Sequence, residues 1–459
     1  MPTVKPRTAN TALGILCLIL AGFALALHSP GHISTDTSIQ LHEAFTGRIE
    51  SWAPPFMSAL LYWLGLGTVG TALFVLLNVA SSYGALYLSA RSKENGGAWS
   101  WPRLGLALAL IANPVVFAYV GIVWKDVLFG VFCVLALALN HAASRCESKR
   151  ATWFVSILAL VVLLPIPLIR QHGTILMPIF AIGPALQIAR HIPRNRRWVV
   201  VALVLIGTYA GYCGVRAMVA ASFEKGPDGR DISVGTTIIK SYDLAGIQYR
   251  TGASGPLAKA GASSEVLAAI EKSYGGDRVD RLGASEPLSK YFNTLGPEQI
   301  DSLWKQAIAD HPRAYIAHRF SAYAWLLDVN DTSACLPFLV GVDGIPTFLN
   351  ESGLRTEMER RDTRLFEWNK HFVTTPLWRH WSYVLLLASL TVFVLLRRRA
   401  LWSVYLPWLA GLILFVGSFL PTTIACDFRY LYALIPCTLA LALGLLRPND
   451  SIAAGEPAA

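Results

Sequence analysis

Four polar segments carry the residues of this sequence that are best suited to chemistry, and each adjoins a long apolar segment. They read HSPGHISTDTSIQLHEAFTGRIESWAPP, GIVWKDVLFG, IRQHGT and TTIACDFRYLY. Each supplies at least one cation, and the first, second and fourth also supply acids. Cations can hold a phosphate, and a nearby carboxylate can accept a proton from a hydroxyl. We therefore expect the four segments to converge on one charged cavity.

Asp36 in the first segment is the candidate catalytic base. It follows the first apolar segment closely, where a carboxylate could accept a proton or hold a divalent metal such as Mg²⁺ or Mn²⁺. A helix cap is the alternative interpretation, because Ser34, Thr35 and Asp36 are all good N-cap residues for the stretch 38–45. The local sequence leaves both interpretations open.

The second and third segments supply two candidate phosphate ligands. Lys125 could contact a phosphate while Asp126 orients it or meets an acceptor sugar. The alternative is an ion pair between these two residues at a membrane interface, beside the interfacial Trp124. Arg170 has the planar guanidinium that suits a phosphate, although Arg170 and His172 could instead extend to the interface or cap a helix end.

The chain before Arg170 predicts a broken helix, because Pro165 and Pro167 precede it closely. Non-helical backbone is tolerated at membrane depth chiefly where it lines a cavity, which favours a functional Arg170. In the fourth segment, Asp427 and Arg429 either form an ordinary ion pair or contribute to the same cavity.

The composition indicates what kind of element positions these residues. Of 459 residues, 54 % are hydrophobic and only 15 % are charged, whereas soluble domains average about 25 % charged residues. The formal net charge is +10, but the Lys and Arg residues alternate with apolar blocks and form no single basic patch. A soluble enzyme, a disordered chain and a nucleic-acid-binding domain are therefore disfavoured. We predict an all-α polytopic membrane protein with membrane lipids, and no nucleic acid, as partners.

About ten apolar segments are long enough to cross a membrane, which takes about 20 residues per helix. The predicted spans are 11–27, 68–90, 103–120, 126–142, 153–169, 174–190, 198–220, 378–396, 401–419 and 429–446. The shorter segment 56–66 predicts a helix that lies at the interface in the first outward loop. Cations concentrate in alternate short loops, which places those loops in the cytoplasm and the four polar segments outside.

The spans divide the chain into modules. We expect a transmembrane module of about seven helices at 1–220, whose first outward loop, 28–55, is the catalytic one. An extracytoplasmic domain follows at 221–377, then a transmembrane module of about three helices at 378–447. The tail 448–459 is expected to be disordered.

The extracytoplasmic domain is predicted to be mainly helical. Gly and Pro turns are expected early, a short amphipathic helix at 264–274, and helices after Pro297 and Pro312. Cys335 and Cys426 are the two cysteines placed outside the membrane. A disulfide between them is left open by the sequence, because nothing in it fixes their separation.

Taken together, these features resemble the GT-C membrane glycosyltransferases, which use polyprenyl-phosphate-linked sugars. The resemblance extends from about residue 11 to 446 through short motifs. They are Asp36 in the long first loop, Trp52-Ala53-Pro54-Pro55, Trp124-Lys125-Asp126, Arg429-Tyr430, and the stretch around Trp304, His311, Pro312 and Tyr315.

The resemblance implies an inverting transferase that moves a sugar from a polyprenyl-monophosphate donor to a glycan, lipid or protein acceptor. Asp36 would deprotonate the acceptor in a single displacement. Lys125 and Arg429, which lie in matched motifs, would contact the donor phosphate, and Arg170, which lies outside those motifs, is the third candidate. The residues expected to bind the sugar or acceptor are Trp52, Trp124, Asp126, His172, Asp427 and Tyr430.

The resemblance leaves a metal requirement open. Relatives often have Trp-His-Pro-Pro where this chain has Ala53 in the second position, and a second acid near Asp36 is missing unless Glu43 or Asp126 replaces it. Asp36 is the one metal ligand that the sequence offers, and no other cofactor is expected.

Two other functions fit the same topology. An O-antigen polymerase or ligase would consume lipid-pyrophosphate glycans and would use Arg and His residues of the extracytoplasmic domain, where Arg313, His318 and Arg319 lie. A non-enzymatic lipid or glycan transporter would show duplicated halves, and no duplication is visible. In the preferred interpretation, the enzyme lies in the cytoplasmic membrane and its site faces the periplasm or cell exterior.

Overall fold

A computed structural model describes residues 3–225, 233–329, 331–332 and 335–448, and within them the chain is almost entirely helical. The predicted tail lies outside the described residues from 449 on. All ten predicted spans are helical. The helices that form them are α1 (Pro6–His28), α4 (Gly67–Ala90), α5 (Trp101–Ile111), α6 (Pro114–Tyr119), α7 (Lys125–Arg145), α8 (Lys149–Leu163), α9 (Ile166–Ile169), α10 (Gly173–Ala189), α11 (Arg197–Ser222), α21 (His380–Arg397), α22 (Trp402–Ser418) and α23 (Leu434–Leu446).

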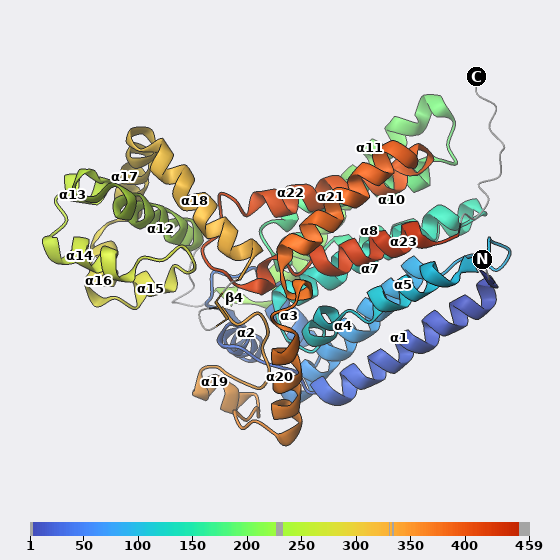
Figure 1. Ribbon diagram of the computed structural model, residues 1–459, viewed down its shortest axis with the longest axis horizontal. Coiled ribbons are helices and arrows are strands. Elements are labelled where there is room, and N and C mark those ends of the chain that lie inside the picture. Colours follow the sequence, from blue (N-terminus) through green and yellow to red (C-terminus); the bar gives the residue numbers. More distant parts are fainter. Residues whose placement is uncertain (1–2, 226–232, 330, 333–334, 449–459) are drawn as a thin grey trace.

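Nine segments of the described chain are long and apolar enough to cross a membrane, and α10 is a shorter apolar helix of 17 residues. This confirms the prediction of an all-α, multi-pass membrane protein. The long helices pack side by side as one bundle (Figure 1). α7 and α23 are the most enclosed, whereas α11 buries few residues and exposes apolar side chains such as Trp198, Leu203 and Ile206. Such an apolar outer surface is what lipid contact requires.

Two of the spans are interrupted by proline. α5 ends before Pro114, and the Asn113 side chain caps α6 by accepting hydrogen bonds from the Val115 and Val116 amides. α8 ends before Pro165, α9 is a single turn, and Arg170 then adopts an extended conformation. The predicted break before Arg170 is therefore confirmed, and it follows from the missing amide and fixed φ of proline.

The short elements of the first loop form one end of the bundle (Figure 1). They are α2 (Thr35–Thr46), β2 (Arg48–Ile49) and α3 (Phe56–Trp63), which matches the short helix predicted at 56–66. β2 pairs in parallel with β4 (Glu224–Lys225), and at the other end β1 (Thr3–Val4) pairs antiparallel with β3 (Trp99–Ser100). The first loop is thus a folded part of the bundle.

The segment between the two sets of spans forms a separate helical group beyond that end of the bundle (Figure 1). It has its own hydrophobic cluster, centred on α12. Its helices are α12 (Ser233–Thr251), α13 (Pro256–Lys259), α14 (Ser264–Ser273), α15 (Asp280–Gly283), α16 (Glu286–Thr294), α17 (Pro297–Asp310) and α18 (Pro312–Leu327). α14, α17 and α18 confirm the predicted helices. Two further helices, α19 (Pro346–Glu351) and α20 (Arg360–Phe372), return to the bundle.

The early Gly and Pro turns predicted in this segment fall partly at 226–232, outside the described residues, and partly at 252–261, where Gly252 and Gly261 have positive φ. Between them, α12 is a helix of 19 residues that the sequence analysis did not name. Its glycines serve close packing. A Cβ at Gly246 would lie 2.2 Å from the His318 ring, and one at Gly235 would lie 3.1 Å from Trp52. These two glycines therefore allow α12 to lie close to neighbouring side chains.

The structure also resolves the open question of the cysteines. Cys335 and Cys426 form a disulfide, with Cα atoms 6.0 Å apart. Cys335 follows α18, and Cys426 immediately precedes the candidate residues Asp427 and Arg429. The bond therefore ties the helical group to the polar segment that enters the last span.

Candidate functional site

Asp36 lies in the first turn of α2, at the mouth of the bundle. The cap interpretation holds only for the place where the helix begins, and the catalytic interpretation stays a prediction. α2 begins where a cap was expected, with Ser34 at the N-cap, yet no side-chain cap hydrogen bond forms. Ser34 Oγ instead accepts a hydrogen bond from Trp124 Nε1 at 2.8 Å. The Asp36 side chain, 49 % exposed, is left to face the cations of the other polar segments.

Arg429 is the centre of the charged cluster. Its Nη1 donates a hydrogen bond to Asp36 Oδ2 at 2.6 Å, and its Nη2 donates to Asp427 Oδ2 at 3.2 Å. Its Nε lies 3.8 Å from Oδ2 of Asp126. One guanidinium thus links acids from the first, second and fourth polar segments, which lie far apart in the sequence. These three segments therefore converge at Arg429.

Asp126 and Arg170 form a buried ion pair behind Arg429. The extended backbone at Arg170, between α9 and α10, allows its side chain to reach into the bundle, where Nη1 also donates to the Tyr430 carbonyl at 3.1 Å. The Arg170 guanidinium lies 5.4 Å from the Tyr430 ring centroid. The helix break thus brings the third polar segment into the cluster, although Arg170 is already occupied by a carboxylate.

Arg278 is a member of the cluster that the sequence did not reveal. Its Nη2 donates to Asp427 Oδ1 at 2.8 Å, so Asp427 is held between Arg278 and Arg429. Arg278 belongs to the helical group, between α14 and α15. No local motif marks it, because its role depends on how that group packs against the segment 420–430.

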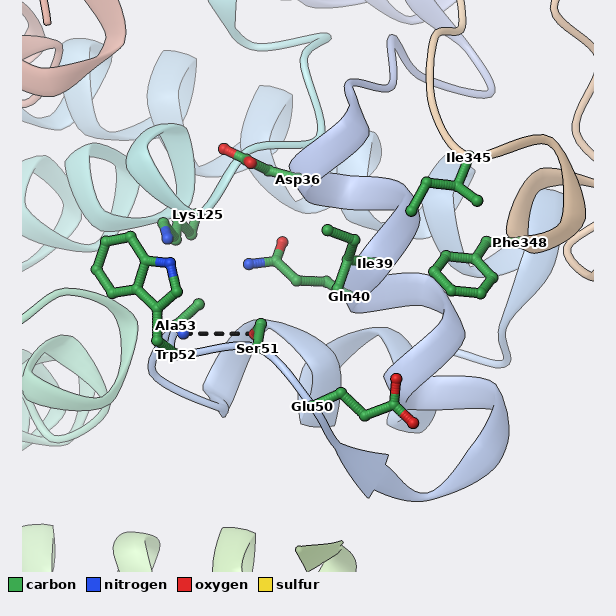
Figure 2. Close-up of a pocket in the computed structure, with 10 residues that line it drawn as sticks. All are labelled: Asp36, Ile39, Gln40, Glu50, Ser51, Trp52, Ala53, Lys125, Ile345 and Phe348. Atoms are coloured by element: carbon green, nitrogen blue, oxygen red, sulfur yellow. Dashed lines mark hydrogen bonds between the residues drawn. The ribbon is translucent and has the colours of Figure 1, made fainter. Parts of the chain in front are cut away.

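A pocket of about 290 Å³ opens beside Asp36. Figure 2 shows Asp36, Lys125 and Trp52 on one side and Ile345 and Phe348 on the other. The remaining lining residues are Ile39, Gln40, Glu50, Ser51 and Ala53. The pocket therefore joins the first loop, the start of α7 and the start of α19. The sequence analysis anticipated neither Ile345 nor Phe348.

Lys125 is the cation that this pocket offers to a ligand. Its ammonium lies 5.5 Å from the centroid of the Trp52 ring, and within the described residues it makes no ion pair. Arg170 and Arg429, by contrast, are each paired with carboxylates. A ligand phosphate would therefore meet Lys125 directly and would have to compete with Asp36 for Arg429.

The structure separates His172 from the other rings that were predicted to bind the sugar or acceptor. Trp52 lines the pocket, and the Trp124 ring lies 5.0 Å from the Arg429 guanidinium, which it helps to position. Tyr430 contributes its carbonyl and ring to Arg170. His172 lies elsewhere: its ring stacks on Phe419 with centroids 4.4 Å apart. His172 is absent from the pocket lining, so the structure gives no support to its predicted binding role.

Opposing effects act on the pKa of Asp36. Burial by surrounding protein would raise the pKa, but the charges of Arg429 and Lys125, with the hydrogen bond from Arg429, outweigh it and lower the pKa below the ordinary value. Asp36 is therefore ionised at neutral pH. An ionised carboxylate can accept a proton, but only after Arg429 releases it.

Glu43 is a structural residue. It is buried, and its Oε1 accepts hydrogen bonds from the Glu50 and Ser51 amides at 3.0 and 2.7 Å. Its Oε2 accepts one from Ser58 Oγ at 2.6 Å. The expectation that Glu43 could replace a second acid beside Asp36 is therefore wrong, because all its bonds fix the turn that presents Trp52. Asp126 is the acid that shares Arg429 with Asp36.

We expect Glu43→Ala to destabilise the protein by about 3 kcal/mol or more, because it leaves two amides and one hydroxyl without an acceptor in a buried place. Glu43→Gln should cost about 1 kcal/mol or less, since the amide oxygen can keep the two backbone bonds. Thermal unfolding of the purified protein in detergent measures the difference. Equal melting temperatures for the two variants would show that these bonds do not hold the loop.

The residues around Asp36 bear on whether a metal could bind there. Among the described residues, no group of three His, Cys, Asp or Glu side chains is placed to hold one. The charge nearest to Asp36 is a guanidinium 2.6 Å away, which would repel a divalent cation.

Comparison of the chain with protein-family models, with curated proteins and with solved structures finds no match. The site's own geometry is therefore the basis for its function.

Proposed function

We propose that the protein is an inverting glycosyltransferase that uses a polyprenyl-monophosphate sugar, with Asp36 as the base. The observation that carries the proposal is the pairing of Asp36 with Arg429 at 2.6 Å beside a pocket that also exposes Lys125. A base and two phosphate-binding cations then lie together at one end of a membrane bundle. The acceptor is a glycan, a lipid or a protein.

Binding of the donor phosphate would prepare the base. The donor phosphate is a diester with one negative charge, and it gains a second charge only as the sugar leaves, so its attraction for Arg429 over that of Asp36 grows during the reaction. Lys125 supplies the second contact without breaking an ion pair. As Arg429 turns to the phosphate, Asp36 is freed to accept a hydrogen bond from the acceptor hydroxyl.

The transfer is a single displacement. The acceptor oxygen attacks the anomeric carbon from the face opposite the phosphate, and its proton passes to the Asp36 carboxylate. The bond between the anomeric carbon and the phosphate oxygen breaks, and polyprenyl phosphate leaves with the electron pair. Arg429 and Lys125 stabilise the charge that develops on that phosphate, which is commonly the largest contribution to catalysis.

Two of the three residues named for the alternative polymerase or ligase lie in a buried cluster. Asp243 Oδ2 of α12 accepts hydrogen bonds from Arg319 Nη2 at 2.6 Å and from Trp304 Nε1 at 2.7 Å, and His318 Nε2 lies 3.1 Å from its Oδ1. Asp243, His318 and Arg319 are all buried, whereas Arg313 is exposed. The cluster joins α12, α17 and α18, which favours a structural role for His318 and Arg319.

The proposed orientation places the pocket on the periplasmic or external side of the cytoplasmic membrane. It rests on the cation-rich loops at the opposite ends of the spans, such as Arg145, Lys149 and Arg397. A polyprenyl tail would then lie in lipid while its phosphate reaches the pocket at the bundle end.

The experiment is transfer of radiolabelled sugar from a panel of synthetic polyprenyl-monophosphate sugars in purified membranes. We expect label to leave one of these lipids, with or without EDTA. Consumption of a pyrophosphate-linked glycan with no release from any monophosphate donor would favour the polymerase or ligase. Release that EDTA abolishes would contradict the metal-free site.

We expect the pH profile to report the lowered pKa of Asp36. An ionised base is lost as pH falls through its pKa, so kcat/KM should stay level from pH 8 down to about pH 4, near the ordinary carboxyl value, and fall only below it. Lys125→Gln removes a charge that lowers this pKa, so the acid limb should move to higher pH. Lys240→Gln, which affects an ion pair with Asp301 and a contact with the Trp304 ring in the helical group, is the control. An unmoved limb in Lys125→Gln would exclude Asp36 as the titrating group.

A further inference from the structure

A second cavity, of about 560 Å³, lies between α1, α6 and α20. It shares no lining residue with the pocket beside Asp36. Leu20 and Phe23 of α1, Phe117 and the residues around it, and Leu365 and Trp368 of α20 form its apolar walls. The α1 residues that line it extend from position 19 to 27, which is about 12 Å of helix.

We expect the two main walls of this groove, α1 and α20, to lie at different depths in the membrane. α1 is one of the predicted spans, so its outer surface at Leu20 and Phe23 faces lipid. α20 is amphipathic and charged, the kind of helix that lies in the interface with its apolar side inward. The Trp368 ring contacts Phe117 edge to face, with centroids 5.6 Å apart. The groove is therefore apolar at membrane depth and is covered by an interfacial helix.

Two arginines of α20 line the same groove, and they differ in their partners. Arg361 donates a hydrogen bond to the Ser29 carbonyl at 2.7 Å and lies 3.5 Å from Asp362 and 3.7 Å from Glu359. Arg364 is exposed, and within the described residues it makes no ion pair or hydrogen bond. It lies one helical turn from Arg361 and Trp368, on the groove side of α20.

We propose that this groove binds an anionic phospholipid, with one acyl chain along α1 and the phosphate on Arg364. An apolar slot that ends at an unpaired guanidinium complements a molecule with an apolar chain and an anionic head. Arg364 can hold two phosphate oxygens with two parallel N–H groups. A zwitterionic lipid brings a cation together with its phosphate, which weakens its net attraction to Arg364, and an uncharged lipid offers no anion at all. The proposal does not depend on the reaction at Asp36.

Native mass spectrometry of the purified full-length protein tests the proposal, with phosphatidylglycerol and phosphatidylcholine of identical chains as probes. The wild type should retain phosphatidylglycerol preferentially. Arg364→Gln should weaken that retention about tenfold, as loss of a charge-assisted contact implies. Ala112→Phe, which fills the groove from an exposed position, should weaken it as well. Lys370→Gln removes a cation from the same helix outside the groove lining and should retain the wild-type behaviour.

Three results would overturn the proposal. Equal retention of phosphatidylcholine would show that the groove does not select an anionic lipid. Displacement of the lipid by glycerol phosphate at equal concentration would show a simple anion site without a role for the groove. Unchanged phosphatidylglycerol binding in both Arg364→Gln and Ala112→Phe would place the lipid elsewhere. Asp36→Asn should bind the lipid as the wild type does, so lipid binding and sugar transfer are tested separately.

Discussion

Replacing Asp36 with asparagine is expected to lower turnover by about 10²–10⁴-fold, the range for loss of a general base. Asparagine has almost the same size and keeps an oxygen that can accept a hydrogen bond from Arg429. It cannot take the proton of an acceptor hydroxyl. The measurement is transfer of labelled sugar by purified enzyme at saturating donor, and the loss should appear in kcat more than in KM.

Glu50→Gln is the matched control for Asp36→Asn. Glu50 lies at the rim of the same pocket, but its carboxylate points away from Lys125 and Trp52 (Figure 2). It makes no ion pair within the described residues, so its neutralisation should leave turnover within about twofold of the wild type. Thermal unfolding should be similar for both variants, because Asp36 is half exposed. Turnover retained in Asp36→Asn, or equal losses in the two variants, would remove Asp36 from the mechanism.

The helices of this protein could be predicted from sequence because the signal is local. Spans need runs of apolar residues, and each of the ten runs is helical in the structure. The break before Arg170 follows from Pro165 in the same way. The element that the sequence analysis did not name is α12, whose glycines allow close contact with His318 and Trp52. A glycine that adjoins another helix and a glycine that forms a turn look alike in one sequence.

The candidate site could be predicted only in part. Asp36, Lys125 and Arg429 stood out because charges at the ends of apolar segments are expensive, and their convergence followed from topology. The identity of each partner did not follow. Arg170 pairs with Asp126, Glu43 serves the fold, and Arg278 enters the cluster from the helical group. These outcomes depend on distances between helices, which hydrophobic periodicity does not encode.

The redundancy of the charged cluster has a consequence for its stability. Asp126 is also held by Arg170, and Asp427 is also held by Arg278. Removal of Arg429 therefore leaves no buried carboxylate without a cation. Arg429 can therefore move from its carboxylates to a substrate phosphate at a modest cost in free energy, whereas the arginine of an isolated buried ion pair could not.

We therefore expect Arg429→Gln to lower turnover by about 10²–10³-fold while the protein remains folded, because it removes charge stabilisation of the departing phosphate. Arg278→Gln is the matched control. Arg278 also holds Asp427, at 2.8 Å, but contacts neither Asp36 nor Asp126, so its loss should change turnover by less than about tenfold.

A double-mutant cycle distinguishes the two roles of Arg429. If it binds phosphate and also restrains Asp36, the losses in Asp36→Asn and Arg429→Gln should be less than additive, since both act on one step. Steady-state kinetics of the two single variants and the double variant give the coupling energy, and thermal unfolding shows whether each is folded. Fully additive losses would mean that Arg429 acts independently of Asp36. An Arg278→Gln loss as large as that of Arg429→Gln would instead assign the effect to Asp427.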